Sequence, residues 1–434
     1  MTSDLGGTTL DNWRDHYAAR TAGLSVSEVR ALFAVASRPE VVSLAGGMPA
    51  VSALPLDLIG DSIQRVMSDA GPVALQYGSG QGLPVLREQI VEICAIEGID
   101  ASANNIVVTT GSQQALDLIT KLFIDEGDVV FVESPSYLGA LGIFRSYQAD
   151  VRHVDTDADG MVPEALEAEI ARATRDGKPM KFLYLIPNFN NPSGVTLSAE
   201  RRPKLIEIAK RHKILIIEDN PYGLLWFDQP APLAMRSIEE DGIVYLGSFS
   251  KTFAPGFRVG WALAPHAIRE KLVLASESAI LCPSAMTQHI ISDYFARADW
   301  RGQIDTFRGI YRERRDAMLG ALDEFLPGFH RTEPNGGFYV WLTLPEHLDS
   351  KGMLPRAVTE LVAYTPGTAF YSNGGGRDKI RLAFCYPTPE NIHEGVRRLS
   401  DVIRQESELY DTFQPAAPSR VADDHFQSPP PDLA

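Results

Sequence analysis

The sequence predicts an α/β protein in which a large, mostly parallel sheet lies between helices and a smaller α/β unit accompanies it. Short apolar runs alternate with helical patterns between residues 106 and 247, which is typical of strands buried on both faces. The chain has 434 residues, too many for one simple core, and strand patterns start again at residue 336. The sequence therefore indicates two domains.

The chain before the sheet is expected to hold an arm, a strand and three helices. These segments are a polar arm at 1–20, a helix at 26–36, a strand at 41–49 and helices at 56–68 and 83–97. Ser27 is a candidate N-cap for the first helix. The strand ends in Gly46 and Gly47, and glycines at a strand end often mark a close approach to the backbone. The glycine-rich loop at 75–82 lacks the Lys-Ser/Thr pair of a P-loop.

The alternating region supplies the strands of the large sheet. The strands are expected at 106–110, 129–133, 149–154, 181–187, 214–219 and 243–247, with helices at 115–123, 163–173 and 199–212. After Trp261 the pattern is helical from 267 to about 326, and a long helix from near Trp300 is expected to connect the two domains. Strands at 336–342 and 379–384 and a helix at 392–408 complete the smaller unit.

These elements divide the chain into five expected parts. They are an N-terminal arm (1–20), the N-terminal part of the small domain (21–55), a large domain (56–312), the C-terminal part of the small domain (313–412) and a tail (413–434). The tail is rich in Pro, Ala, Ser and Asp, and this composition predicts disorder.

Composition and charge exclude several classes of function. The net charge of −16 argues against a nucleic-acid partner, since phosphate backbones need basic surface. No apolar stretch is long enough to span a bilayer, and no signal-peptide pattern opens the chain, so we expect a cytoplasmic protein without a membrane partner. Cys94, Cys282 and Cys385 are far apart and suit buried thiols rather than a zinc site.

The turn after the strand at 243–247 carries the most informative residues. Lys251 stands among the hydroxyls of Ser248 and Ser250, with Arg258 following a Pro-Gly turn. A constrained turn at the end of a buried strand suits a nucleophilic amine. Hydroxyls and a guanidinium suit a phosphate monoester. A lysine beside a phosphate site predicts pyridoxal 5'-phosphate (PLP), held as a Schiff base on Lys251.

Other strand ends supply what PLP requires. The Gly111-Ser112-Gln113 junction opens a helix, whose N-terminal N–H groups suit the phosphate. Asp219 ends a buried strand, where a protonated pyridine nitrogen would compensate its charge. Asn191 and Tyr222 are candidate donors to the 3-hydroxyl oxygen of the ring, and Tyr137 is a candidate stacking partner.

The order of these motifs resembles that of the fold-type I PLP-dependent aminotransferases of class I and II. Within them the chain is most similar to the 2-aminoadipate, kynurenine and aromatic aminotransferases, from about Val26 to Ser400. The motifs that carry the resemblance are Ser27-Glu28-Val29-Arg30, Ser43-Leu44-Ala45-Gly46-Gly47-Met48-Pro49, Gln76-Tyr77-Gly78, Asn191-Pro192-Ser193-Gly194, Asp219-Asn220-Pro221-Tyr222 and the Lys251 turn. The resemblance implies a large sheet of the seven-stranded type.

The resemblance also implies roles for further residues. Tyr77 would reach across a homodimer interface to the PLP phosphate of the partner subunit. Arg381 would bind the substrate α-carboxylate through two hydrogen bonds. Arg30, on a helix that covers the site in these relatives, would meet a distal carboxylate. The implied substrate-binding residues are Arg381, Gly46, Gly47, Asn191, Arg30 and Tyr77, and the implied catalytic residues are Lys251, Asp219 and Tyr222.

The activity expected from this resemblance is ping-pong transfer of an amino group from an L-amino acid to 2-oxoglutarate. Lys251 would remove the α-proton as general base, while Asp219 keeps the ring protonated. The donor stays open among 2-aminoadipate, aromatic and branched or aliphatic amino acids. Two alternatives also stay open: another PLP reaction, such as β-elimination or decarboxylation, and a PLP-binding regulator without turnover.

Overall fold

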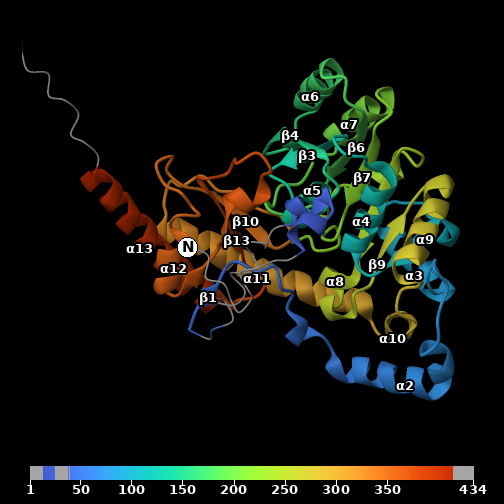
Figure 1. The fold of residues 1–434 in the computed structure, drawn as a ribbon. Coiled ribbons are helices and arrows are strands. Elements are labelled where there is room, and N and C mark those ends of the chain that lie inside the picture. The colour runs from blue at the N-terminus through green and yellow to red at the C-terminus, as the bar shows by residue number, and fades with distance from the viewer. Residues whose placement is uncertain (1–12, 25–37, 39, 414–434) are drawn as a thin grey trace, which may run out of the picture.

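The computed structural model describes residues 13–24, 38 and 40–413, and it confirms the predicted α/β class (Figure 1). The large sheet has eight strands in the order β2-β9-β8-β7-β6-β3-β4-β5. These strands are β2 (Ile106–Thr109), β3 (Val129–Ser134), β4 (Asp150–Asp157), β5 (Gly160–Met161), β6 (Met180–Leu185), β7 (Leu215–Asp219), β8 (Ile243–Ser248) and β9 (Gly260–Leu263).

The central strands of this sheet are parallel. β4, β3, β6, β7 and β8 pair in parallel, while β2, β9 and the two-residue β5 join through antiparallel pairs. The sheet therefore has one short strand more than the expected seven. β9 was not predicted as a strand because it follows the Lys251 turn directly, without the helix that separates the parallel strands.

Both faces of the sheet are apolar because alternate residues of each strand enter different cores. In β3, Val130 and Val132 pack in one cluster with Leu116, whereas Phe131 packs in the other with Leu166. The helices of this unit are α3 (Pro84–Ile96), α4 (Ser112–Phe123), α5 (Leu138–Ser146), α6 (Pro163–Arg175), α7 (Arg201–Arg211), α8 (Phe249–Thr252), α9 (His266–Ile280) and α10 (Ala285–Arg297). This two-sided packing fixes the strand ends that carry the site.

The smaller unit contains an antiparallel sheet in the order β10-β13-β12 and a parallel pair, β1-β11. Its strands are β1 (Val42–Ser43), β10 (Tyr339–Thr343), β11 (Val362–Ala363), β12 (Thr365–Pro366) and β13 (Lys379–Ala383). Its helices are α12 (Leu354–Thr359) and α13 (Pro389–Phe413), and the long α11 (Trp300–Phe325) packs against α13. Because β1 pairs with β11, residues 42–43 belong with the C-terminal part of the chain.

Short 3₁₀ turns connect these elements. They are η1 (Arg14–His16), η2 (Ala19–Gly23), η3 (Val51–Ala53), η4 (Ala103–Asn105), η5 (Met235–Ser237), η6 (Pro255–Phe257) and η7 (Gly367–Phe370). η2 packs on α5 of the large unit, since a Cβ at Gly23 would lie 2.7 Å from the carbonyl oxygen of Arg145. The domain boundaries remain a proposal, and this packing favours placing residues 19–23 with the large unit.

Several elements differ from their predicted bounds or were not predicted, and α2, α5 and β10 are examples with a local cause. α2 (Leu56–Ala74) passes the expected end at residue 68 and includes Pro72. α5 was not predicted, because Gly139 and Gly142 weaken its helical pattern. The strand expected from residue 336 begins at Tyr339, because Gly337 has a φ of +71° that a regular strand does not accommodate.

Some predictions fall on residues outside those described. The helix at 26–36 with Ser27 and Arg30, residues 1–12 of the arm and residues 414–434 of the tail are among them. Within the described part of the chain, no helix is both long and apolar enough to cross a membrane.

Candidate functional site

The candidate site lies at the carboxyl ends of β6, β7 and β8, where parallel strands bring their following loops together. A cavity of about 280 Å³ opens there against residues of the smaller unit. The residues that line it are Gly47, Ser112, Gln113, Leu116, Tyr137, Leu138, Ile186, Asn191, Asp219, Pro221, Tyr222, Ser248, Ser250, Lys251, Pro255, Arg258, Tyr339 and Arg381. Most of the residues proposed from the sequence therefore share one cavity.

Lys251 projects from the short helix α8, which Ser248 caps at its N-terminus. Its Nζ donates a hydrogen bond to the carbonyl oxygen of Gly47 at 3.0 Å. The pKa of the amine is lowered to about 8, chiefly by burial and also by the positive charges of Arg381 and Arg258, while Cys385 opposes the shift. Among the described residues, no carboxylate forms an ion pair with Lys251. A buried amine with a depressed pKa is what covalent catalysis by lysine requires.

Asp219 ends β7 with its carboxyl group buried. Its Oδ2 accepts a 2.8 Å hydrogen bond from the hydroxyl of Tyr184, but its buried Oδ1 has no hydrogen-bond donor within the described ranges. Burial raises the pKa of this carboxyl to about 6, and the Tyr184 hydrogen bond opposes that shift. An unpaired buried acceptor of this kind calls for a donor from a ligand, and a protonated ring nitrogen would supply one.

An anion-binding corner forms where α4 begins. Gly111, with a φ of +81°, precedes the helix, and a Cβ there would lie 2.5 Å from Nη2 of Arg258. The Arg258 guanidinium also donates to the Ser250 hydroxyl and to the Thr110 carbonyl oxygen, each at 3.4 Å. The Ser248 hydroxyl accepts from the N–H of Ser250 at 3.1 Å. A helix N-terminus, hydroxyls and a guanidinium together fit a phosphate monoester.

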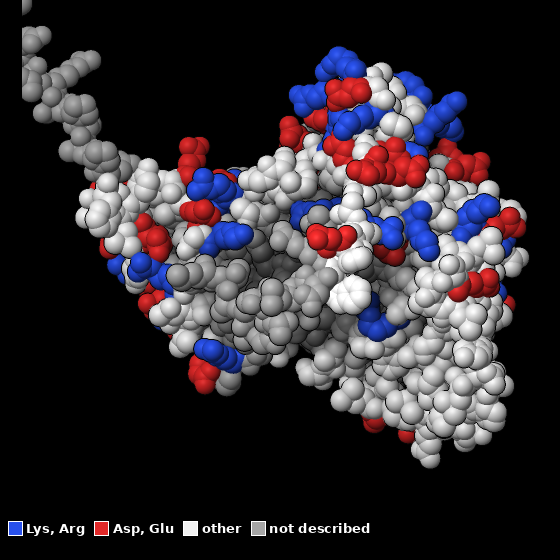
Figure 2. Space-filling model, viewed as in Figure 1, with Lys and Arg blue, Asp and Glu red and all other residues white. Residues whose placement is uncertain are grey.

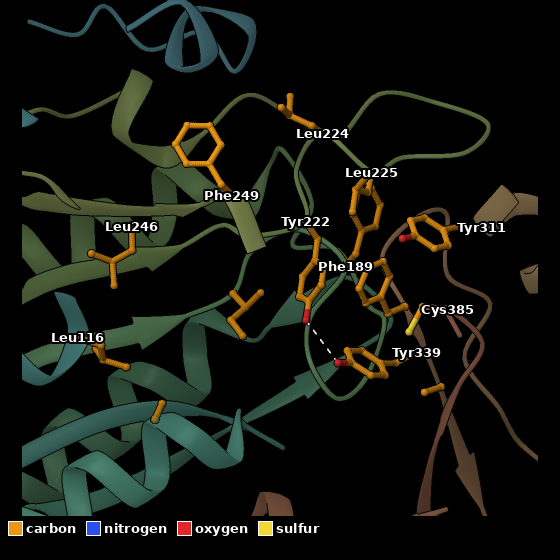
Figure 3. Packing of buried hydrophobic residues seen from close by; sticks show 14 of the residues in the cluster. Leu116, Phe189, Tyr222, Leu224, Leu225, Leu246, Phe249, Tyr311, Tyr339 and Cys385 are labelled. Carbon is orange, nitrogen blue, oxygen red and sulfur yellow. Dashed lines mark hydrogen bonds between the residues drawn. The ribbon is translucent and has the colours of Figure 1, made fainter. Parts of the chain in front are cut away.

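Aromatic rings also line the cavity. Tyr137 donates from its hydroxyl to Oε1 of Gln113 at 3.2 Å, and burial raises its pKa to about 12. The hydroxyls of Tyr222 and Tyr339 lie 3.5 Å apart, as the dashed line in Figure 3 shows. Tyr222 comes from the loop after β7 and Tyr339 from β10, so the two units meet at this pair.

Arg381 lies in the middle of β13 and is only 3% exposed. It donates to Oδ1 of Asn191 at 2.8 Å and to the carbonyl oxygen of Ala45 at 2.6 Å. Its guanidinium lies over the ring of Tyr339 at 4.3 Å, and its Nε has no acceptor among the residues that the structure describes. No carboxylate in those residues pairs with it, so a ligand carboxylate would complete the site.

Three further sequence candidates, Gly46, Gly111 and Tyr77, lie outside the cavity lining. Gly111 and Gly46 lie beside the cavity, where Arg258 and Cys385 respectively contact them. Tyr77 is 77% exposed at the surface of this single chain. Arg30 lies outside the described residues. The structure therefore does not bring Tyr77 into the cavity of the chain that carries it.

Sequence reasoning missed Tyr184 and Tyr339. Both stand in strands whose other residues are mostly apolar, and a polar tip in such a strand was the available signal. A Cβ at Gly47 would overlap the Tyr339 hydroxyl, which explains why glycine is needed there. The residues present thus fit PLP: an amine, an anion corner, an unpaired carboxylate oxygen and aromatic walls.

Comparisons with known proteins agree with this geometry. A family model described as aminotransferase class I and II matches residues 40–399. Aromatic-amino-acid aminotransferase 1 of Thermococcus litoralis is 40% identical over 94% of this chain and 98% of its own length. The 2-aminoadipate transaminase of Thermus thermophilus is 35% identical over 91% of this chain and 98% of its own length. The structure of a Pyrococcus horikoshii kynurenine aminotransferase, solved with PMP, superposes with a TM-score of 0.87 at 37% identity, covering 92% of this chain and 99% of its own.

The depressed pKa of Lys251 predicts how its covalent capture of PLP depends on pH. The amine must be unprotonated, so the capture rate should rise with pH, reach half its maximum near pH 8 and level off about one unit above that pH. An ordinary lysine would give a rate that rises to about pH 10. Rapid mixing of the cofactor-free protein with PLP measures this profile. Lys251→Ala should abolish capture, the exposed control Lys210→Ala should not, and a rate still rising above pH 9 would contradict the assignment.

Substitution of Gly47 tests the contact between the two units. Gly47→Ala places a methyl group against the Tyr339 hydroxyl and should lower kcat/KM by about 100-fold, since small displacements of reacting groups are costly. The matched control is Gly320→Ala in α11, where a Cβ meets no atom within 4 Å. Steady-state kinetics on both variants make the comparison, and unchanged activity of Gly47→Ala would show that the overlap does not matter.

Proposed function

Because the chain belongs to the class I and II aminotransferases, we propose that it moves the amino group of an aromatic L-amino acid to 2-oxoglutarate. Its cofactor is PLP. The observation that carries the proposal is Arg381: a buried guanidinium without a carboxylate partner in the described chain lies on the same cavity as Lys251. The α-carboxylate is the feature that amino acids and their keto acids share, and Arg381 would bind it on the same cavity as Lys251.

The residues divide the work as follows. When bound, PLP supplies a ring that accepts electrons and stabilises negative charge at the α-carbon of the amino acid. Gly111, Ser112 and Arg258 would hold its phosphate, and Asp219 would pair with its ring nitrogen. Arg381 binds and orients the α-carboxylate. The unprotonated Nζ of Lys251 would take the α-proton as general base and then deliver it to the aldehyde-derived carbon of the cofactor.

The walls of the cavity support an aromatic donor. The rings of Tyr137, Tyr222 and Tyr339 line it, and its cationic side chains are Lys251, Arg258 and Arg381. Each of these cations already has a proposed role, and Tyr137 and Tyr222 are the proposed contacts of the cofactor ring. The described lining therefore leaves the Tyr339 ring, rather than a charge, for the donor side chain. Arg30, which lies outside the described residues, remains our proposed contact for the distal carboxylate of 2-oxoglutarate.

We also propose that the functional unit is a homodimer. Apolar side chains of α2 and the loop after it are exposed in the single chain: Leu56, Leu58, Ile63, Met67, Val73, Leu75 and Tyr77. α2 runs along the lower edge of the molecule (Figure 1), where few charged side chains appear (Figure 2). A second copy would cover this face and receive Tyr77 at its phosphate corner. The three cysteines are free, in keeping with the cytoplasmic location that we propose.

An amino-donor screen with 2-oxoglutarate tests the proposed reaction. Phenylalanine, tyrosine, tryptophan, kynurenine, leucine, 2-aminoadipate and aspartate are each supplied, and glutamate formation is measured. Aromatic donors should give a kcat/KM about tenfold or more above aspartate, which carries a charged side chain. Release of ammonia with pyruvate, release of CO₂, or no glutamate from any donor would contradict aminotransfer.

Replacement of Arg381 tests the carboxylate contact. Arg381→Lys keeps the charge but loses the planar fork, so kcat/KM for the donor should fall about 100-fold, mainly through KM. PLP content should stay unchanged, because Arg381 lies on the substrate side of the cavity. Arg236→Lys, at a buried arginine that does not line the cavity, is the matched control. An unchanged KM in Arg381→Lys would place the carboxylate elsewhere.

A complementation experiment tests the shared site. Lys251→Ala and Tyr77→Ala homodimers should each be poor catalysts. A mixed dimer has one Lys251→Ala subunit and one Tyr77→Ala subunit. If Tyr77 acts on the partner subunit, one of the dimer's two sites contains both a native Lys251 and a native Tyr77. Random exchange should then restore about a quarter of the wild-type activity. No recovery, in a mixture shown by native mass spectrometry to contain mixed dimers, would contradict a shared site.

A further inference from the structure

Tyr184 is a fully buried residue of β6 whose hydroxyl donates to Oδ2 of Asp219 at 2.8 Å. Its ring packs against Phe144 of α5, with centroids 5.6 Å apart. Among the described residues, Tyr184 is the one side chain that donates a hydrogen bond to the Asp219 carboxyl group. β6 and β7 are neighbours in the sheet, so two rigid strands set this geometry.

The two oxygens of Asp219 are in different environments. Oδ2 is bound by Tyr184, while Oδ1 is buried without a donor in the part of the chain that is described, and Asp219 lines the cavity. A carboxylate is free to turn about its last side-chain bond. With Oδ2 held by Tyr184, that rotation is restricted, and Oδ1 is left for a ligand. A neutral donor also leaves the negative charge of Asp219 uncancelled, which a lysine or arginine would not.

We propose that Tyr184 is a positioning residue for the cofactor: its hydrogen bond fixes the Asp219 carboxylate so that Oδ1 meets the ring nitrogen of PLP. The inference rests on the proposed role of Asp219. It adds that this role depends on a residue that does not line the cavity. Removal of the Tyr184 hydroxyl should therefore weaken cofactor binding without removing any atom that contacts the cofactor.

The same hydrogen bond sets the pH range in which Asp219 is charged. It favours the ionised form and opposes the upward pKa shift that burial causes, so its loss should move that pKa higher. Among the described residues, the phenols of Tyr184 and Tyr137 face Asp219, and burial raises their pKa values. Lys251 lines the same cavity, and Glu133 interacts with Tyr184. Neither phenol titrates between pH 5 and 8. Burial brings the pKa values of Lys251 and Glu133 to about 8, so the part of the Tyr184→Phe shift that disappears in the Asp219→Asn background is the part that reports on Asp219.

The test compares the rate at which holoenzyme releases PLP between pH 5 and 8, without substrate, for wild type and Tyr184→Phe. Phenylalanine keeps the ring contacts with Phe144, so the variant should fold. At pH 6 it should release PLP about tenfold faster, since hydrogen bonds to charged groups are strong. The acid-induced rise in release should move up by about one pH unit. The matched control is Tyr364→Phe, which removes a buried hydroxyl bound to the Ser350 carbonyl oxygen and should change release less than about twofold.

A second experiment, in the Asp219→Asn variant, distinguishes a positioning role of Tyr184 from a packing role. Asp219→Asn has no titratable group at this position, so adding Tyr184→Phe should not shift the pH profile of PLP release any further. Two results would overturn the proposal: a Tyr184→Phe profile that coincides with wild type, or faster release by one factor at every pH with no shift. Because no amino acid is present, neither result depends on the donor or acceptor. A failed donor screen would leave this measurement intact.

Discussion

The site depends on the buried carboxylate of Asp219, of which only one oxygen has a hydrogen-bond donor in the described residues. Asp219 is 5% exposed at the end of a central strand, and Tyr184 binds one of its oxygens while the other has no donor in the described residues. An uncompensated buried carboxylate destabilises a fold by several kcal/mol. Such a group persists when a ligand completes it, and a protonated pyridine nitrogen has the charge and the N–H that Oδ1 lacks.

Arg381 carries the opposite charge to Asp219, and the two side chains do not form an ion pair in the described residues. Its guanidinium is bound by neutral oxygens and stacked on an aromatic ring, with no carboxylate partner in the described chain. Asp219 comes from the large sheet and Arg381 from the small one, and both line one cavity. The two charges suit two ligands that bind side by side: a cofactor with a cationic ring, which would meet Asp219, and a substrate with an anionic carboxylate, which would meet Arg381. Lys251, with its lowered pKa, is the reactive group beside them.

The fold and most of the site follow from local patterns, because buried parallel strands read as apolar runs and their loops meet at one edge. Asp219, Lys251 and Arg258 could be proposed because each follows such a run. Tyr339 and Tyr184 could not, since a buried tyrosine looks the same whether it packs or positions a neighbour. β9 was not predicted because it follows the Lys251 turn without a long helix before it, and α5 was not predicted because its glycines weaken the helical pattern. The exposure of Tyr77 has no explanation within a single chain, and its proposed partner is a second copy.

The pairing of Asp219 with the ring nitrogen is tested most directly by a cofactor analogue in which that nitrogen is replaced by C–H. Dissociation constants for PLP and the analogue are measured with wild type and with Asp219→Asn. Wild type should prefer PLP by about 100-fold or more, since the analogue leaves a buried charge unpaired, and Asp219→Asn should show little preference. Equal binding of the two cofactors to the wild-type protein would contradict the account.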